Sequence, residues 1–308
     1  MCNGSIMDKL VSFALPLMLS GILQLMFNAV DIIVVGRFSG SEALAAVGST
    51  TALINVFTNL FIGISLGANV LAARFFAAGR KEEMSETVHT SITLALISGI
   101  LMAFVGLVFS KGALELMGTP EDVIGLSTLY MRIYFMGMPF FMLYNYGAAI
   151  LRAVGDTKRP LYFLIIAGVI NAGLNMVLVI VFGLGVAGVG IATVFSQMVS
   201  CVLVLTCLCR TEGSYKLSFS KLSMKGYYLK QIFQVGIPAG IQSTVINFSN
   251  ALLQSSVNSF GSTAMAGYTA ANNILGFLYV SINSVTQACM SFTSQNFGVG
   301  KYKRMDRV

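Results

Sequence analysis

The stretch that decides the fold is LVSFALPLMLSGILQLMFNAVDIIVVGRF, residues 10–38, an apolar run that contains one acidic residue, Asp31. It is longer than the roughly 20 residues that a helix needs to cross a bilayer. Asn28, Gln24 and Ser20 precede Asp31 at helical spacing, so the four side chains form one polar stripe. A carboxylate in hydrocarbon costs several kcal/mol unless it faces protein or water, or takes up a proton or cation. We therefore interpret Asp31 as functional; the alternative is a helix-packing hydrogen bond or an acid that reaches the membrane interface.

The composition excludes a soluble globular protein. Of the 308 residues, 56% are hydrophobic and 10% charged, whereas soluble domains are about 25% charged. The net charge of +7 comes from basic residues placed between the apolar runs, which indicates membrane orientation rather than nucleic-acid binding. The five cysteines are odd in number and show no metal-ligand spacing, so we expect neither a disulfide framework nor a zinc site.

Eight segments are long and apolar enough to span a bilayer, which predicts an all-α polytopic membrane protein. We assign residues 1–209 to an N-terminal six-helix lobe, 210–229 to a basic cytoplasmic linker, and 230–308 to the first two helices of a second lobe. The predicted spans are residues 10–37, 43–75, 85–110, 122–151, 160–183, 187–209, 228–258 and 264–297.

The basic residues predict the orientation of the chain. All but three of the 19 Lys and Arg residues precede the first span or follow the second, fourth, sixth and eighth; the three are Arg37, Lys111 and Arg132. Cytoplasmic loops of membrane proteins carry an excess of Lys and Arg. We therefore expect both ends of the chain to be cytoplasmic.

The last two spans repeat the first two. At an offset of 222 positions Pro16 pairs with Pro238, and after a one-residue gap Phe76 pairs with Phe297. Because six spans separate the copies, they start on the same side, as in transporters built from parallel repeats. The second repeat is partial, with two spans against six, and it has Leu253 where Asp31 would map.

Amide side chains recur along the later spans. This pattern is more typical of the wall of a water-filled cavity than of simple helix packing. With the stripe of the first span they give the predicted substrate cavity. Pro16 and Pro238 lie near the cytoplasmic starts of their spans, where a proline either permits bending or merely begins a helix. We expect both to act as hinges. The predicted cavity residues are Gln24, Asn28, Asn247, Asn250, Gln254, Tyr279 and Asn283.

Two enzyme-like motifs do not fit their usual settings. GLGVAG at 183–188 joins two spans, so we predict a tight turn rather than a nucleotide site. GISLG at 63–67 lies within a span, where Gly63 and Gly67 are better explained by close helix packing. An intramembrane enzyme would need His89, the only histidine, beside Ser65. We disfavour that reading and expect no enzyme activity.

Two asparagines in the fifth span and a threonine in the sixth add to the polar set. Asn171 and Asn175 are four apart and share a helix face; Thr193 lies in the next span. Amides and hydroxyls suit a weak Na⁺ site or a hydrogen-bond network around a titrating acid. Most intramembrane Asn and Thr residues simply bond neighbouring helices, so this pattern alone is weak.

Three segments carry a family resemblance: LPLMLSGILQLMFNAVDIIVVGRFSGSEALAAVG at 15–48, ILRAVGDTKRPLY at 150–162 and INAGLNMVLVIVFGLGVAGVGIATVFSQ at 170–197. Together they resemble the multidrug and toxic compound extrusion (MATE) family, in its bacterial branch of DinF-like and MepA-like exporters. The resemblance implies roughly twelve helices in two lobes and exchange of H⁺ or Na⁺ for organic, often cationic, drugs.

The resemblance also implies residue roles. Asp31 matches the acid of the first span and Pro16 its bending proline, while Asn171, Asn175 and Thr193 match the cation site of the first lobe. Many relatives carry Asp at position 175, so Asn175 favours H⁺ over Na⁺ here.

The expected partners are small drugs and the lipid bilayer, without nucleic acid, and the expected location is a bacterial inner membrane. Beyond the coupling ion we expect no cofactor or metal. The resemblance implies four further helices of a second lobe, which either a longer chain or a partner would supply, and we expect function to need them. A lipid-linked saccharide flippase of the same superfamily is the alternative within transport.

Overall fold

The computed structural model describes residues 1–258 and 262–308, without the side chains of residues 52, 247, 248, 251, 252, 254, 255, 257, 258, 262–270 and 272–274. Throughout these residues the regular elements are helices, which confirms the all-α prediction. In chain order they are α1 (Ile6–Phe38), α2 (Gly40–Ala77), α3 (Lys81–Leu116), α4 (Glu121–Met136), α5 (Met138–Ala153), α6 (Lys158–Asn175), η1 (Met176–Val181), α7 (Gly185–Arg210), η2 (Phe219–Lys221), α8 (Gly226–Asn258), α9 (Ser262–Gly298) and α10 (Tyr302–Met305).

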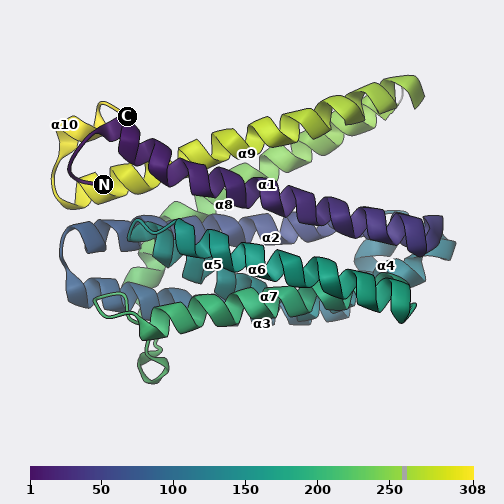
Figure 1. The fold of residues 1–308 in the computed structure, drawn as a ribbon, viewed down its shortest axis with the longest axis horizontal. Coiled ribbons are helices and arrows are strands. Elements are labelled where there is room, and N and C mark those ends of the chain that lie inside the picture. The colour runs from purple at the N-terminus through teal and green to yellow at the C-terminus, as the bar shows by residue number, and fades with distance from the viewer. Residues whose placement is uncertain (259–261) are drawn as a thin grey trace.

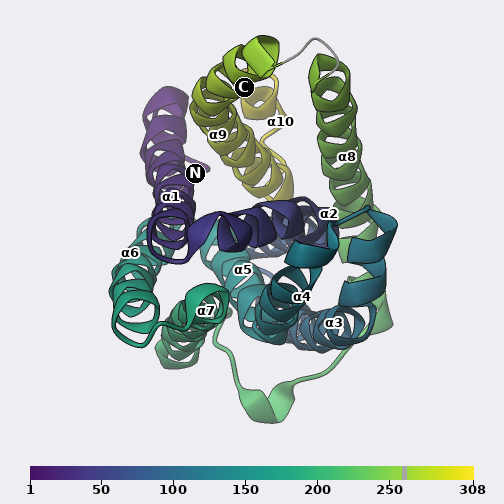
Figure 2. The same cartoon turned by 90° about the vertical axis from the view of Figure 1, so that its right-hand side faces the viewer.

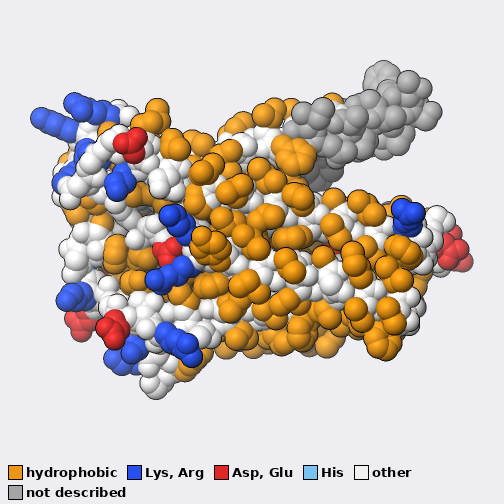
Figure 3. All heavy atoms as spheres, in the orientation of Figure 1, with side chains coloured by type: hydrophobic (Ala, Val, Ile, Leu, Met, Phe, Trp, Pro, Cys, Tyr) orange, Lys and Arg blue, Asp and Glu red, His pale blue; other side chains and the backbone are white. Residues whose placement is uncertain are grey.

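The long helices run side by side along the long axis of the molecule (Figure 1). Seen from one end, α1 to α7 form one bundle, and α8 and α9 lie against its α1–α2 side (Figure 2). Both termini lie at the same end (Figure 1), and on the face shown most Lys and Arg side chains gather at that end while apolar side chains cover the middle (Figure 3). In the described residues, five helical segments are long and apolar enough to cross a membrane: α1, α2, α3, Lys158–Val181 and α7.

The fourth predicted span, residues 122–151, consists of two helices in the structure. The chain breaks at Gly137, between α4 and α5. Pro139 lies in the first turn of α5, where its missing N–H has no cost, but inside a continuous helix its ring would clash with the carbonyl of Phe135. The break lets α3 approach closely, since a Cβ on Gly99 would lie 2.5 Å from the Pro139 Cα.

The fifth predicted span changes from an α-helix to a π-helix before it ends. After Asn175 the α-helix continues as a π-helix, Met176–Val181, and such wide turns are frequently found at functional sites. The turn that follows contains Gly183 and Gly185, both with positive φ, a conformation that glycine adopts at little cost. The predicted tight turn at GLGVAG is confirmed.

The repeat is visible in the way α2 and α9 end. Gly79 and Gly300 have φ of 68° and 70°. Their N–H groups donate to Phe76 and Phe297, at 3.2 and 3.1 Å, which is a left-handed helix cap at equivalent positions. The same local sequence therefore builds the same helix end in both copies.

Glycines bring α8 directly against α2. A Cβ on Gly63 would lie 2.3 Å from the Gly240 Cα, and one on Gly67 would lie 2.2 Å from the Ile232 carbonyl oxygen. Only glycine allows two helix backbones to approach this closely. The prediction of close packing at GISLG is confirmed, and its partner is the first helix of the second repeat.

The linker between α7 and α8 is tied to the start of α3. The Ser218 N–H donates to His89 Nε2 at 3.2 Å, and His89 Nδ1 lies 2.7 Å from the Ser85 carbonyl oxygen. Lys225 Nζ pairs with a Glu86 carboxylate oxygen at 2.7 Å, and this hydrogen bond raises the pKa of the exposed Lys225 ammonium. The linker is therefore docked on the first lobe.

Candidate functional site

Asp31 is buried although its neighbours on the polar stripe are not. Its side chain is 8% exposed, while Gln24 and Asn28 are exposed. Asn175 Nδ2 donates to Asp31 Oδ1 and lies 3.2 Å from Asn171 Oδ1. Both asparagines are buried, Asn175 completely. The structure thus joins three of the four residues predicted for the cation site.

Local packing explains why α1 and α6 meet at this point. A Cβ on Gly168 would overlap the ring of Phe27, so the glycine leaves room for that ring. Phe27 lies one helical turn before Asp31, and Gly168 lies one turn before Asn171. The close contact therefore places the acid of α1 opposite the amides of α6. Asn175 is the last residue of the α-helical part of α6, where the π-helix begins.

One polar atom of the site has no partner. Asn175 Oδ1 is buried and makes no hydrogen bond among the described residues. Leaving a buried polar atom unpaired costs about 1–3 kcal/mol. The atom is therefore available as an acceptor for a proton or as an oxygen ligand for a cation.

Sequence reasoning missed three residues of the site. Tyr130 and Tyr134 on α4 are close enough for the Asp31 charge to act on their hydroxyl groups. Gln197 on α7 lies beside Tyr134, and its amide oxygen would lie 3.2 Å from a Cβ on Gly137. The four-residue spacing of the two tyrosines puts them on one helix face, which was the available signal.

Thr193 is not hydrogen-bonded to the cluster. Its hydroxyl donates to the Val189 carbonyl oxygen of its own helix at 3.0 Å. A threonine in a helix often satisfies its hydroxyl in this way. Its predicted role as a cation ligand stays a prediction.

The predicted substrate-cavity residues lie on exposed surfaces of α1, α8 and α9. Gln24, Asn28, Asn250, Tyr279 and Asn283 are exposed, whereas the side chains of Asn247 and Gln254 lie outside the described residues. Their common role in a cavity stays a prediction.

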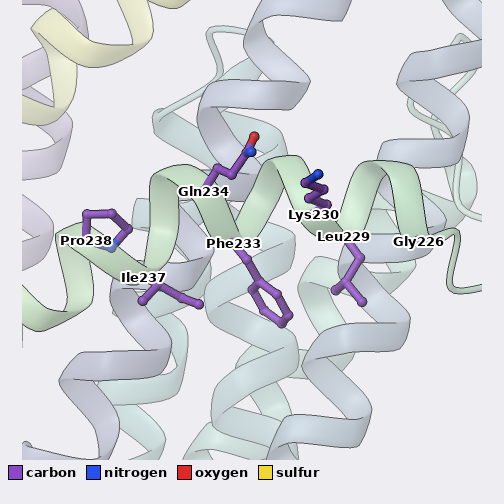
Figure 4. Close-up of a pocket in the computed structure, with 7 residues that line it drawn as sticks. All are labelled: Gly226, Leu229, Lys230, Phe233, Gln234, Ile237 and Pro238. Atoms are coloured by element: carbon purple, nitrogen blue, oxygen red, sulfur yellow. The ribbon is translucent and has the colours of Figure 1, made fainter.

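A cavity of about 520 Å³ follows the first turns of α8 instead. Leu229, Phe233 and Ile237 extend from one side of the helix, and Lys230 and Gln234 from the other (Figure 4). Apart from Pro238, none of the residues predicted for function lines it.

Both predicted hinge prolines lie inside continuous helices, Pro16 in α1 and Pro238 in α8. The Ser20 hydroxyl donates to the Pro16 carbonyl oxygen at 2.8 Å. Bending at either proline stays a prediction.

A transporter family accounts for this fold and site. The MatE family model matches residues 16–177 and 238–308. The chain is 33% identical over 313 residues to the probable multidrug resistance protein YoeA of Bacillus subtilis, covering 99% of this chain and 67% of that protein. It is 20% identical to the multidrug export protein MepA of Staphylococcus aureus, with 99% and 68% covered. A crystal structure of MATE in the bent conformation superposes with a TM-score of 0.91 at 24% identity, covering 99% of this chain and 68% of that one.

The chain therefore belongs to the MATE family of efflux transporters, and the family resemblance is confirmed. It spans about two thirds of the length of these relatives.

Ser65 and His89, the residues considered for an enzyme site, form hydrogen bonds with different parts of the chain. The Ser65 hydroxyl donates to the Ile62 carbonyl oxygen at 2.7 Å, and the nitrogens of His89 contact Ser85 and Ser218. Members of this family are transporters, which supports a non-enzymatic function for the chain.

Proposed function

We propose that the protein is a secondary-active antiporter of a bacterial inner membrane, in which inward movement of H⁺ or Na⁺ drives outward movement of small organic, often cationic, compounds. The observation that carries this proposal is the buried Asp31 held by the amides of α6. An acid inside a membrane helix commonly marks an ion or proton path. The names of the relatives, a probable multidrug resistance protein and a multidrug export protein, support drugs as substrates.

Proton binding would change how α1 is held to α6. An ionised Asp31 accepts the hydrogen bond from Asn175 Nδ2, whereas a neutral Asp31 has a proton to donate. The unpaired Asn175 Oδ1 is an acceptor for that proton after rotation of the amide. The change exchanges a charge-assisted bond for a weaker neutral one. This local event can bias α1 toward bending at Pro16. Protonation of Asp31 would then switch α1 between two conformations.

The donor set favours H⁺ over Na⁺ as the coupling ion. Hard cations prefer anionic oxygen ligands, and the cluster offers one carboxylate, Asp31. Asn175 turns an N–H group, not an oxygen, toward that carboxylate. A sodium ion would have to displace this hydrogen bond, whereas a proton only reverses it.

The arrangement of the helices supports alternating access. α8 and α9 diverge from α1 and α2 toward the end away from the termini (Figure 1). Nearer the termini, the Ser291 hydroxyl donates to Asn69 Oδ1 at 3.0 Å, and Gln295 Nε2 donates to the Ala153 carbonyl oxygen at 2.7 Å. With the basic loops in the cytoplasm, we infer that these contacts close the cytoplasmic side and that α8 and α9 separate from α1 and α2 on the outer side. The exposed amides on α1, α8 and α9 would then face the proposed drug path.

The test is ion-coupled export by Asp31→Asn, in inverted membrane vesicles from cells that express the protein with a complete second lobe. Asparagine resembles a permanently neutral acid. We expect the variant to fold and bind drug but to lose export driven by a pH or Na⁺ gradient, with partial activity in Asp31→Glu. An Asp31→Asn variant that exports drug in response to the gradient as the wild type does would remove Asp31 from the mechanism.

A further inference from the structure

A second cavity lies where α6 begins and α7 ends, at the end of the bundle that carries the termini. Its volume is about 450 Å³. The cavity is far along both helices from the Asp31 cluster, and the transport mechanism above does not use it. The lining residues are Arg159, Cys207, Arg210, Thr211, Glu212 and Tyr215.

The two arginines of this cavity are placed differently. Asp156 Oδ2 pairs with Arg159 Nε at 3.1 Å, and Arg159 Nη1 contacts Cys207 Sγ at 3.5 Å. These contacts hold the guanidinium in place and leave Nη2 for a ligand. Arg210 forms no ion pair with any described residue, within 4.0 Å. A guanidinium presents a planar fork of N–H donors that matches a phosphate group.

The acidic residues beside the cavity do not neutralise it. Asp156 Oδ1 accepts the backbone N–H groups of Lys158 and Arg159, at 3.2 and 3.1 Å, so this carboxylate caps the start of α6. Residues 156–159 and 207–216 together contain four basic and two acidic side chains. Glu212 lines the cavity and can accept a hydrogen bond from a ligand hydroxyl. The lining itself holds two arginines and one glutamate; Asp156 is engaged with Arg159 and the start of α6, and Lys158 and Lys216 add positive charge around the cavity.

Each arginine stands at the end of an exposed apolar stripe. On α6 the stripe continues from Arg159 through Tyr162, Ile166 and Val169, which are 58%, 44% and 66% exposed and follow helical spacing. On α7 exposed apolar side chains occur at Phe195 and Val202, and Arg210 ends that face. In a membrane protein such surfaces contact lipid chains. The cavity thus lies where headgroup and hydrocarbon regions meet.

We propose that this cavity binds the headgroup of an anionic phospholipid from the adjacent leaflet, with its acyl chains along the stripes of α6 and α7. Arg159 and Arg210 would hold the phosphate. Tyr215, packed edge-on against Phe76 with centroids 6.2 Å apart, forms the wall on the linker side. Basic pockets between membrane helices on this side are typical sites for anionic headgroups. Because Glu212 is an acceptor, a headgroup with hydroxyls, such as that of phosphatidylglycerol, fits best.

The test is native mass spectrometry of the purified full chain in a neutral detergent, titrated with phosphatidylglycerol or phosphatidylcholine. We compare wild type with Arg159→Gln/Arg210→Gln, and with Lys303→Gln/Arg307→Gln as a control that removes the same charge from exposed residues elsewhere on the same end. We expect preferential binding of phosphatidylglycerol by wild type and control. The cavity variant should bind it at least about tenfold more weakly, since a hydrogen bond to a charged group contributes about 1.5–3 kcal/mol.

Two further arms separate the alternatives. If Arg159→Gln disturbs folding through Asp156, Arg210→Gln alone should still weaken binding, because Arg210 holds no described ion pair. Equal binding of phosphatidylglycerol by all variants would overturn the proposal. Inorganic phosphate that displaces the lipid completely, together with equal binding of both lipids, would instead indicate a free-phosphate site and would also overturn it.

Discussion

At the scale of single residues, the exposure of Asp31 separates it from the rest of its stripe. Ser20, Gln24 and Asn28 follow the same helical spacing, but the acid alone is placed against α6 by the contact of Phe27 with Gly168. Burial of a carboxylate is tolerated where hydrogen-bond donors compensate it, and Asn175 supplies one. The burial and hydrogen bonding of Asp31 therefore depend on how α1 packs against α6.

Asn175→Asp should shift ion preference toward Na⁺. The change adds a second carboxylate beside Asp31 and removes the N–H donor that now occupies it. We expect drug export to become more dependent on a Na⁺ gradient, measured in vesicles with separate pH and Na⁺ gradients. The control is Ser220→Asp, which adds the same charge on the exposed linker, away from Asp31, and should leave ion preference unchanged. Unchanged preference in both variants would mean that residue 175 is not part of the ion site.

The sequence predicts part of this site for a physical reason. Asn171 and Asn175 share a face because helical spacing is local, and an acid in an apolar run stands out by its cost. Helical spacing puts Tyr130 and Tyr134 on one face of α4, but their approach to Asp31 depends on how α4 packs, and nothing local marks Gln197 on α7. Residues that share a helix face can be predicted from the sequence, whereas contacts between helices cannot.

At the scale of elements, the contact of α2 with α8 depends on the absence of side chains. Gly63→Ala should destabilise the protein by about 1–3 kcal/mol, the usual cost of overpacking, because its Cβ would meet the Gly240 backbone at 2.3 Å. Gly48→Ala is the matched control, since it lies in the same helix with nothing within 4 Å of the added Cβ. Thermal unfolding in detergent, followed by helical circular dichroism, measures both. A Gly63→Ala protein as stable as Gly48→Ala would show that the helices can separate without cost.

The docking of the linker can be tested at His89. His89→Ala leaves the Ser218 N–H without its acceptor, and this costs about 1–3 kcal/mol if the group stays buried. We expect the linker to detach locally, so that trypsin cleaves faster after Lys216 and Lys221 while the helices remain intact. Thr93→Ala is the control, because that hydroxyl bonds only the His89 carbonyl oxygen of its own helix, at 2.8 Å. Equal cleavage rates in the two variants would contradict a linker held by His89.

The apolar pattern predicts most helices but not their interruptions. Hydropathy locates the runs that become α1, α2, α3 and α7, because the bilayer demands length and apolarity. The break at Gly137 and the π-helix after Asn175 lie within equally apolar runs, so hydropathy has no signal there. Pro139 lies in the first turn of α5, where proline is favoured, but a proline alone does not predict a break in this chain, because Pro16 and Pro238 lie inside continuous helices.

At the scale of the whole molecule, the repeat relates two parts that are unequal in this chain. The ends of α2 and α9 are alike in their caps, yet α2 is packed within the first bundle and α9 lies on its side (Figure 2). The sequence predicts the likeness, because the same residues recur at a fixed offset. It does not predict the divergence of α8 and α9 from α1 and α2, which depends on packing between the repeats.

The orientation of the whole molecule is the last prediction. All but three of the Lys and Arg residues belong to the side that also carries both termini, so that side should be cytoplasmic. Single cysteines would be introduced at positions 184 and 221, after replacement of the five native cysteines by serine. Leu184 is 44% exposed and avoids the positive φ of Gly185, while Lys221 is exposed on the linker.

An impermeant thiol reagent added to intact cells should label Leu184→Cys and not Lys221→Cys. In inverted vesicles the pattern should reverse, and this reversal serves as the control for reactivity of each thiol. Label at Lys221→Cys in intact cells would place the basic loops outside. The form closed at the terminal end would then be open to the cytoplasm, while the direction of exchange, which the inward ion gradient sets, would stay as proposed.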